Sequence, residues 1–315
     1  MKRFNKFLGV VLAVTVFASM AMASSSTDSD STKAVSGDET TSSVAEAAAS
    51  EDVTEKESET TAATAAALPK IEQQVLVDEK GIKITALEYS TDDIWGDGIK
   101  VEIENNTKKD LTVGCNALIV NDYMITDLMS ASVAAGMKTK DTINLSSSQL
   151  KAAGINNIGQ IEIYFHIYNS ETYKTVLDTG CVTIKTDLYD KMDKVPQDNG
   201  YELYNDKGIR IVAKYADEDS FWGKAVVLYI ENNTKKNVTI QLKNFSVNGY
   251  TVDPLFSSTV YKGKKAIDEI TLLSSDLEEK DIDKIEEVQL AFNIMDAKSY
   301  KTITKTKALT FKVEQ

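Results

Sequence analysis

Few residues in this sequence could carry out chemistry, and its histidine is the first to consider. His166 is the single histidine among 315 residues, so the chain has no second imidazole for a zinc site. A serine or cysteine nucleophile needs a base beside it, and the sequence singles out no such base. At the position of His166 the second copy of an internal repeat, described below, carries Asn293. The sequence therefore predicts a protein that is not an enzyme and uses no cofactor.

Carboxylates are numerous, and two acidic loops hold them beside aromatic residues, at 92–97 and 217–222. Calcium takes about six to eight oxygen ligands, usually on alternating positions with a final bidentate Glu, and neither loop has this spacing. A glycosidase needs two carboxylates placed across a cleft, which a small β-sandwich seldom provides. We therefore expect no metal ligands, and keep an unrecognised calcium-dependent or hydrolytic domain as an alternative.

Trp95 and Trp222 are the two tryptophans, at equivalent places in these loops. If exposed, they would be possible ligand contacts, because indole rings stack on sugars and anchor protein partners. If buried, each would close one end of a domain. The sequence favours burial, because each follows a large apolar residue and precedes a glycine.

Cys115 and Cys181 are the two cysteines, and in a secreted chain such a pair is a possible disulfide. The second copy of the repeat carries Leu242 and Ala308 at these positions, so the fold does not require a bridge. The sequence leaves both states open.

The chain repeats itself at an offset of 127 residues. Lys80 aligns with Lys207 without a gap up to Thr186, and 40 of the 107 positions compared are identical, far above chance. Two copies with so long a period indicate domain duplication, since solenoid units span about 20–50 residues. We predict a module at 71–187, a linker at 188–200 and a second module at 201–315.

Within each module, apolar residues alternate with polar ones, which predicts strands with one buried face. In the first module the expected strands are 82–89, 99–103, 111–115, 118–125, 139–145, 158–168 and 175–185. The Asn-Asn-Thr-Lys-Lys stretch at 105–109 is expected to join two of them as a hairpin. Seven antiparallel strands in about 110 residues fit an immunoglobulin-like sandwich. One short helix per module is expected, with a capping box at Ser275–Glu278 and a stop at Gly154.

The segments ENNTKKNVTIQLKNFSVNGYTVDP (231–254) and SSDLEEKDIDKIEEVQLAFNI (274–294) resemble the uncharacterised immunoglobulin-like extracellular modules of clostridial, Gram-positive secreted proteins. The resemblance covers both modules, and the first copy departs from it at Asp122 and Gln149. It implies an all-β fold of two tandem sandwiches and an extracellular setting. It implies no catalytic residues.

The N-terminus has the form of a secretory signal peptide, at 1–23. Lys2, Arg3 and Lys6 precede an apolar run at 7–17, and Ala21-Met22-Ala23 fits signal peptidase cleavage. An uncleaved membrane anchor is the alternative interpretation. Residues 24–70 form a linker rich in Ser, Thr, Ala and Glu, and ten acidic residues against two lysines at 24–68 favour disorder there.

The formal net charge of −13 argues against nucleic acid as a partner, because binding to phosphates needs clustered Lys and Arg. We expect a secreted chain without a membrane span after cleavage, either released or bound non-covalently to the cell wall. Its expected function is binding to an unknown extracellular or cell-wall ligand, and a structural spacer is the alternative. Lys262, Lys264 and Lys265 are either a solvated loop or a docking patch for an anionic wall polymer.

Overall fold

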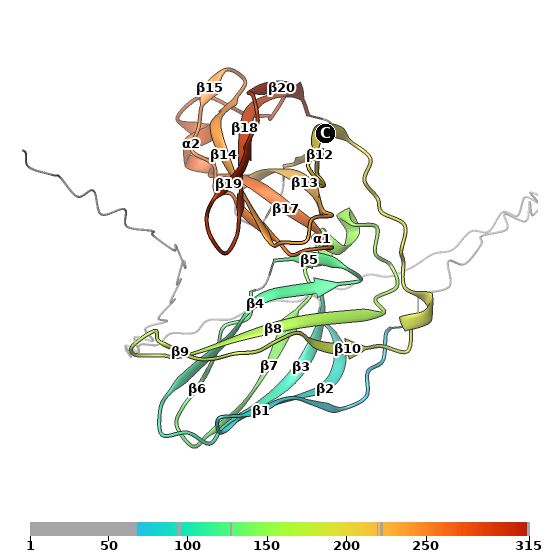
Figure 1. The fold of residues 1–315 in the computed structure, drawn as a ribbon, viewed down its shortest axis with the longest axis vertical. Helices are drawn as coiled ribbons and strands as arrows, with labels where there is room; N and C mark the ends of the chain where they lie inside the picture. Colours follow the sequence, from blue (N-terminus) through green and yellow to red (C-terminus); the bar gives the residue numbers. More distant parts are fainter. Residues whose placement is uncertain (1–67, 93–95, 127, 219, 221–222, 314–315) are drawn as a thin grey trace, which may run out of the picture. The chain divides into compact units, whose positions relative to one another are not determined.

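The computed structural model describes residues 68–92, 96–126, 128–218, 220 and 223–313, apart from the side chain of Asp92. These described residues form an all-β fold with two short α-helices, as the alternation of apolar residues predicts (Figure 1). The predicted signal peptide, nearly all of the predicted linker, and both tryptophans lie outside the described residues. No helix in the described ranges is long and apolar enough to cross a membrane.

Module 1 places its strands in two sheets. The first has the antiparallel order β1-β2-β3-β7, and the second is built around β4 and β8. The strands of the first sheet are β1 (Gln74–Glu79), β2 (Ile82–Asp92), β3 (Gly96–Asn105) and β7 (Lys138–Asn144). Those of the second are β4 (Leu111–Val120), β5 (Tyr123–Ile125), β6 (Ala131–Val133), β8 (Gln160–Asn169), β9 (Thr175–Asp178) and β10 (Val182–Lys185), and α1 (Ser147–Ala152) connects β7 to β8.

Module 2 repeats this arrangement strand by strand. Its first sheet has β11 (Tyr201–Asp206), β12 (Ile209–Asp217), β13 (Lys224–Asn232) and β17 (Lys265–Leu272). Its second has β14 (Val238–Val247), β15 (Tyr250–Thr251), β16 (Ser257–Val260), β18 (Glu287–Asp296), β19 (Thr302–Lys305) and β20 (Leu309–Lys312). α2 (Ser274–Glu278) is the counterpart of α1, and a 3₁₀ helix, η1 (Tyr189–Lys191), begins the connection between the modules.

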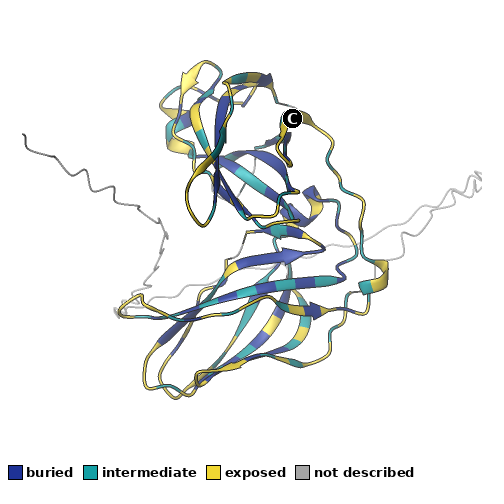
Figure 2. Ribbon diagram, viewed as in Figure 1, coloured by how far each residue is buried: buried dark blue, intermediate teal, exposed yellow. Residues whose placement is uncertain are grey.

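Buried and more exposed residues alternate along the strands, because successive side chains of a strand point to opposite faces of the sheet. In β8 every second residue from Ile161 to Asn169 is buried, and the residues between are partly exposed (Figure 2). The buried side chains of β2, β3, β4 and β8 meet in one apolar core, and those of β12, β13, β14 and β18 meet in another. Burial of apolar area at about 25 cal/mol per Å² is the main force holding these sheets face to face.

The predicted hairpin at 105–109 is wrong. β3 pairs with β2 and β7, whereas β4 pairs with β5, β6 and β8, so the turn carries the chain from one sheet to the other. The side chain of Asn105, which is 1% exposed, holds the turn on this path between the two sheets. Its amide Nδ2 donates to the carbonyl oxygens of Lys109 and Val133, and it thereby ties the turn to the start of β4 and the end of β6.

The helix prediction is confirmed in place and partly wrong in detail. α1 and α2 lie where the sequence puts them, and Gly154, with a φ of +69°, ends the segment after α1. The capping box does not form, because α2 begins at Ser274 after Leu273 and has no side-chain capping hydrogen bond. The described residues of each module form ten strands instead of seven, since short β-strands such as β1 and β6 lie where no alternation is long enough to detect.

The second sheet of module 1 continues into the first sheet of module 2. β5 pairs in parallel with β17, with Tyr123 opposite Lys265 and Met124 opposite Ala266. The main-chain N–H of Lys265 also donates to the carbonyl of Asp122 at 3.0 Å. A ten-stranded sheet results, in the order β10-β8-β4-β5-β17-β13-β12-β11 with β6 and β9 at its side. The described residues accordingly belong to one compact unit.

Candidate functional site

The motifs that both modules share serve to hold loops. Asn232 repeats the bonds of Asn105: its Nδ2 donates to the carbonyls of Lys236 and Val260, and its Oδ1 accepts from the N–H and the hydroxyl of Thr234. These bonds use the Asn side chain completely. The Asn-Asn-Thr-Lys-Lys turn is therefore a structural element and has no polar atoms of Asn232 to spare for a ligand.

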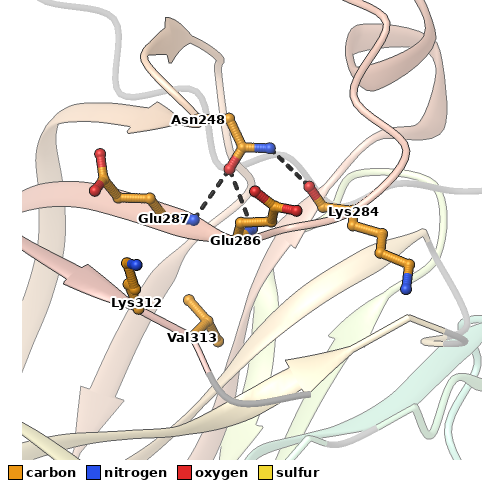
Figure 3. Close-up of a pocket in the computed structure, with 6 residues that line it drawn as sticks. All are labelled: Asn248, Lys284, Glu286, Glu287, Lys312 and Val313. Atoms are coloured by element: carbon orange, nitrogen blue, oxygen red, sulfur yellow. Dashed lines mark hydrogen bonds between the residues drawn. The ribbon is translucent and has the colours of Figure 1, made fainter.

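Asn248, which aligns with Asn121 of module 1, lines a pocket of about 610 Å³ in module 2, shown in Figure 3. Asn248 Oδ1 accepts from the N–H groups of Glu286 and Glu287, and Nδ2 donates to the carbonyl of Lys284. Asn121 makes the three equivalent bonds in module 1, to Gly159, Gln160 and Asn157. The Asn248 amide fixes the loop that precedes β18. The pocket therefore results from the way this loop is held.

The possible ligand contacts Trp95 and Trp222 lie outside the described residues, together with the tips of the two acidic loops. Among the residues that are described, no three His, Cys, Asp or Glu side chains cluster as metal ligands would. At the flank of the second loop, Lys224 Nζ pairs with Glu218 Oε2.

Cys115 and Cys181 form no disulfide, because strand β8 lies between them. Cys115 is on β4, opposite Phe165, and Cys181 directly precedes β10 on the other side of β8. Two strand spacings amount to about 9.5 Å, beyond the roughly 7 Å limit between the Cα atoms of a bridged pair. His166, also on β8, places Nδ1 2.6 Å from Asp178 Oδ1 on β9. Module 2 has Asn293 and Lys305 at these positions, so this contact belongs to module 1 alone.

The junction between the modules is held by polar side chains that are not shared. Lys264 Nζ lies 2.6 Å from Asp122 Oδ1 and 2.8 Å from Glu162 Oε2. Burial alone would lower the pKa of Lys264, but the hydrogen bonds and charges of Asp122 and Glu162 outweigh burial and raise it. Gln149 Nε2 donates to the carbonyl of Ile267 at 2.8 Å. The counterparts of these four side chains in the other copy are Met137, Gly249, Gln289 and Asp276.

The apolar side of the junction differs between the copies in the same way. The outer face of β12, β13 and β17 carries four buried residues that join the core of module 1, namely Val212, Val227, Tyr229 and Ile267. The equivalent face of module 1 is polar, with Thr85, Lys100, Glu102 and Lys140 in their places. The differences between the copies thus follow the contact surface, and sequence patterns within one module could not reveal it.

A groove of about 1310 Å³ lies beside the junction. Module 1 contributes Glu162, Tyr164 and Cys181 to its lining. The rings of Tyr164 and Tyr261 meet edge to face there, with centroids 5.0 Å apart. Burial, and next a hydrogen bond with Cys181, raise the pKa of Tyr164. Module 2 contributes six lysines, which are Lys235, Lys236, Lys262, Lys264, Lys298 and Lys301.

Part of this groove was foreseeable from the sequence. The lysine cluster at 262–265 is visible there, and the structure puts Lys262 and Lys264 in the groove. Lys265 lies apart from that lining, with Nζ 5.3 Å from the centroid of the Tyr123 ring. Tyr164 and Tyr261 carried no signal, because they are 97 residues apart and lie in different modules.

No known protein family matches the sequence, and no curated protein matches it. The solved structures similar to it include an exo-β-D-glucosaminidase, at 12% identity and a TM-score of 0.22, over 69% of this chain and 26% of that one. Another is red sea bream transglutaminase, at 8% identity and a TM-score of 0.19, over 78% of this chain and 31% of that one. The chain thus spans about a quarter to a third of the length of these enzymes. Similarity this weak carries no argument about function.

Proposed function

We propose that this chain is a secreted, non-catalytic protein of two immunoglobulin-like modules that binds an extracellular or cell-wall ligand in the groove beside the junction. The observation that carries the proposal is where the two copies differ. Tyr164 and Cys181 line the groove, whereas module 2 has Ala291 and Ala308 at these positions. Because module 2 folds without these side chains, the fold does not require them, and they are available for another role in module 1.

The groove also has the size and the composition of a binding site. Its volume of about 1310 Å³ exceeds the roughly 300–1,000 Å³ of a small-molecule pocket, which suits a segment of a polymer. Its walls come from both modules, and the β5–β17 pairing holds those walls together. Such preorganisation lowers the entropy that is lost on binding.

The test is a binding screen with a groove that can be blocked. Glycans, wall polymers and matrix proteins are arrayed and probed with the protein in a Cys115→Ala background, before and after a bulky maleimide is attached to the exposed Cys181. We expect at least one ligand, and its loss on labelling. The matched control is Cys181→Ser with Ala308→Cys, which carries the same label at the equivalent exposed position of module 2. The absence of any ligand of millimolar affinity, or equal loss in the control, would contradict the proposal.

A structural spacer is the second candidate, and the continuous sheet favours it. The ten-stranded sheet contains strands of both modules, joined at β5 and β17, which suits a stiff element that sets a distance. A spacer needs no accessible groove, so the blocked-groove screen separates the two functions. If the screen finds no ligand, a structural spacer is the better explanation.

A further inference from the structure

The lysines of the groove identify a class of ligand. We propose that the groove binds a polyanionic polysaccharide, with anionic groups on the lysines of module 2 and a sugar ring against the Tyr164–Tyr261 pair. This inference rests on the proposed binding function and goes beyond it by naming the ligand chemistry.

The charge of the groove is opposite to that of the chain. Six lysines line it against two carboxylates, Glu162 and Asp296, in a protein of formal net charge −13. Both carboxylates already have lysine partners: Glu162 pairs with Lys264, and Asp296 Oδ2 lies 2.8 Å from Lys236 Nζ. Within the described part of the chain, the other four lysines make no ion pair, which leaves Lys235, Lys262, Lys298 and Lys301 for a ligand.

The fold does not require these charges. Lys262 and Lys298 are exposed, and their counterparts in module 1 are Ala135 and Glu171. At the position of Lys298 and Glu171, the same loop carries opposite charges in the two modules. Lys235 and Lys301 have the counterparts Lys108 and Lys174, so module 1 supplies lysines at the same loop positions without the groove.

A polysaccharide fits this arrangement better than duplex nucleic acid or an acidic peptide. Duplex DNA carries one charge per about 1.7 Å and is attracted over long distances, which the acidic remainder of this chain opposes. A sugar chain presents ring faces that pack on aromatic side chains. Tyr164 and Tyr261 are partly exposed in the groove and offer such a surface beside the lysines.

The experiment measures binding of the full chain to dextran sulfate and to neutral dextran of the same length, by fluorescence polarisation at low and at high salt. We expect binding to dextran sulfate alone, weakened by salt, since screening shortens the reach of surface charges to about 3 Å at 1 M. Lys262→Ala with Lys298→Ala should weaken it at least about tenfold, in keeping with the usual contribution of a lysine near an anionic surface. Lys108→Ala with Lys174→Ala, the matched control in module 1, should change it less than about twofold.

Three results would overturn the inference. These are equal binding of the neutral polymer, equal loss in the groove and control variants, and tighter binding of poly-L-glutamate or duplex DNA than of dextran sulfate. Thermal melts of each variant check that its fold is intact. A neutral ligand from the array that a label on Cys181 displaces would refute the polyanion while the binding function stands. If the array yields no ligand and dextran sulfate does not bind, both the inference and the proposed function are refuted.

Discussion

The side-chain amide Nε2 of Gln149, in module 1, donates a 2.8 Å hydrogen bond to the main-chain carbonyl of Ile267, in module 2. Gln149 is 3% exposed, and its other bonds go to Thr126, whose N–H donates to Oε1 and whose hydroxyl accepts from Nε2. A buried amide satisfied in this way specifies how two surfaces meet, because other arrangements would leave its polar atoms unpaired.

Gln149→Ala should lower the free energy of unfolding by about 1–3 kcal/mol, because it leaves the carbonyl of Ile267 and the N–H of Thr126 without these partners. Urea unfolding followed by tryptophan fluorescence measures the loss. The matched control is Asp276→Ala at the same helix position of module 2, for which we expect less than about 1 kcal/mol. Equal losses in the two variants would contradict a special role of Gln149 in the junction.

Ile267→Lys should uncouple the modules without unfolding them. Ile267 is 1% exposed against the core of module 1, and an unpaired lysine there costs about 3 kcal/mol or more. Module 1 accepts Lys140 at the equivalent position, where no second module covers it. We expect one calorimetric transition for the wild-type protein and two for Ile267→Lys, with faster proteolysis within residues 188–200 of the variant. Lys140→Ile should keep one transition, and one transition in Ile267→Lys would refute the coupling.

Asp268 should make the protein less stable as the pH rises from about 4 to about 6. Burial, partly offset by a hydrogen bond from Ser258, raises the pKa of Asp268 from its ordinary 3.8 to about 6. Between these values the native state binds more protons than the unfolded state, so the free energy of unfolding falls with pH. A shift of this size is worth at most about 3 kcal/mol.

Asp268→Asn removes this titration, so it should raise the free energy of unfolding at pH 7 by about 1–3 kcal/mol. Urea unfolding over a series of pH values, for the wild-type protein and the variant, isolates the contribution of Asp268 as a difference. An identical pH profile for both proteins would show that the carboxyl titrates normally.

Asn232→Ala should lower the free energy of unfolding by more than about 2 kcal/mol. Asn232 is 0% exposed, and without its amide the carbonyls of Lys236 and Val260 lose a hydrogen-bond donor. Asn233, the exposed next residue, gives the control, and Asn233→Ala should change stability by less than about 0.5 kcal/mol. Thermal or urea unfolding compares the two. Similar costs would mean that the turn depends on its backbone alone.

Part of the fold was predictable because its signals are local. The alternation in Ile99, Val101 and Ile103 indicates a strand, since side chains in a strand point to opposite faces in turn. The gapless repeat showed the duplication, and Gly154 showed where the segment after α1 ends. These features depend on neighbours a few residues away, or on direct comparison of the two copies.

Other features depended on which strands became neighbours. Leu111, Val113 and Cys115 predict a strand, but no local pattern says that β4 lies in the other sheet from β3 or that β8 separates Cys115 from Cys181. Of the candidate site, the lysines at 262–265 could be seen in the sequence. Their partners Asp122 and Glu162 could not, because they are more than 100 residues away.

The sequence by itself determined that this protein consists of two related β-modules, because alternation and repetition are properties of the chain. The tertiary structure alone decided what the differences between the copies mean. Tyr229 in place of Glu102, or Gln149 in place of Asp276, looks like unremarkable variation until β5 pairs with β17. The physical reason is that burial and hydrogen bonding act between surfaces brought together by folding, and a residue's contribution is set by the surface it meets.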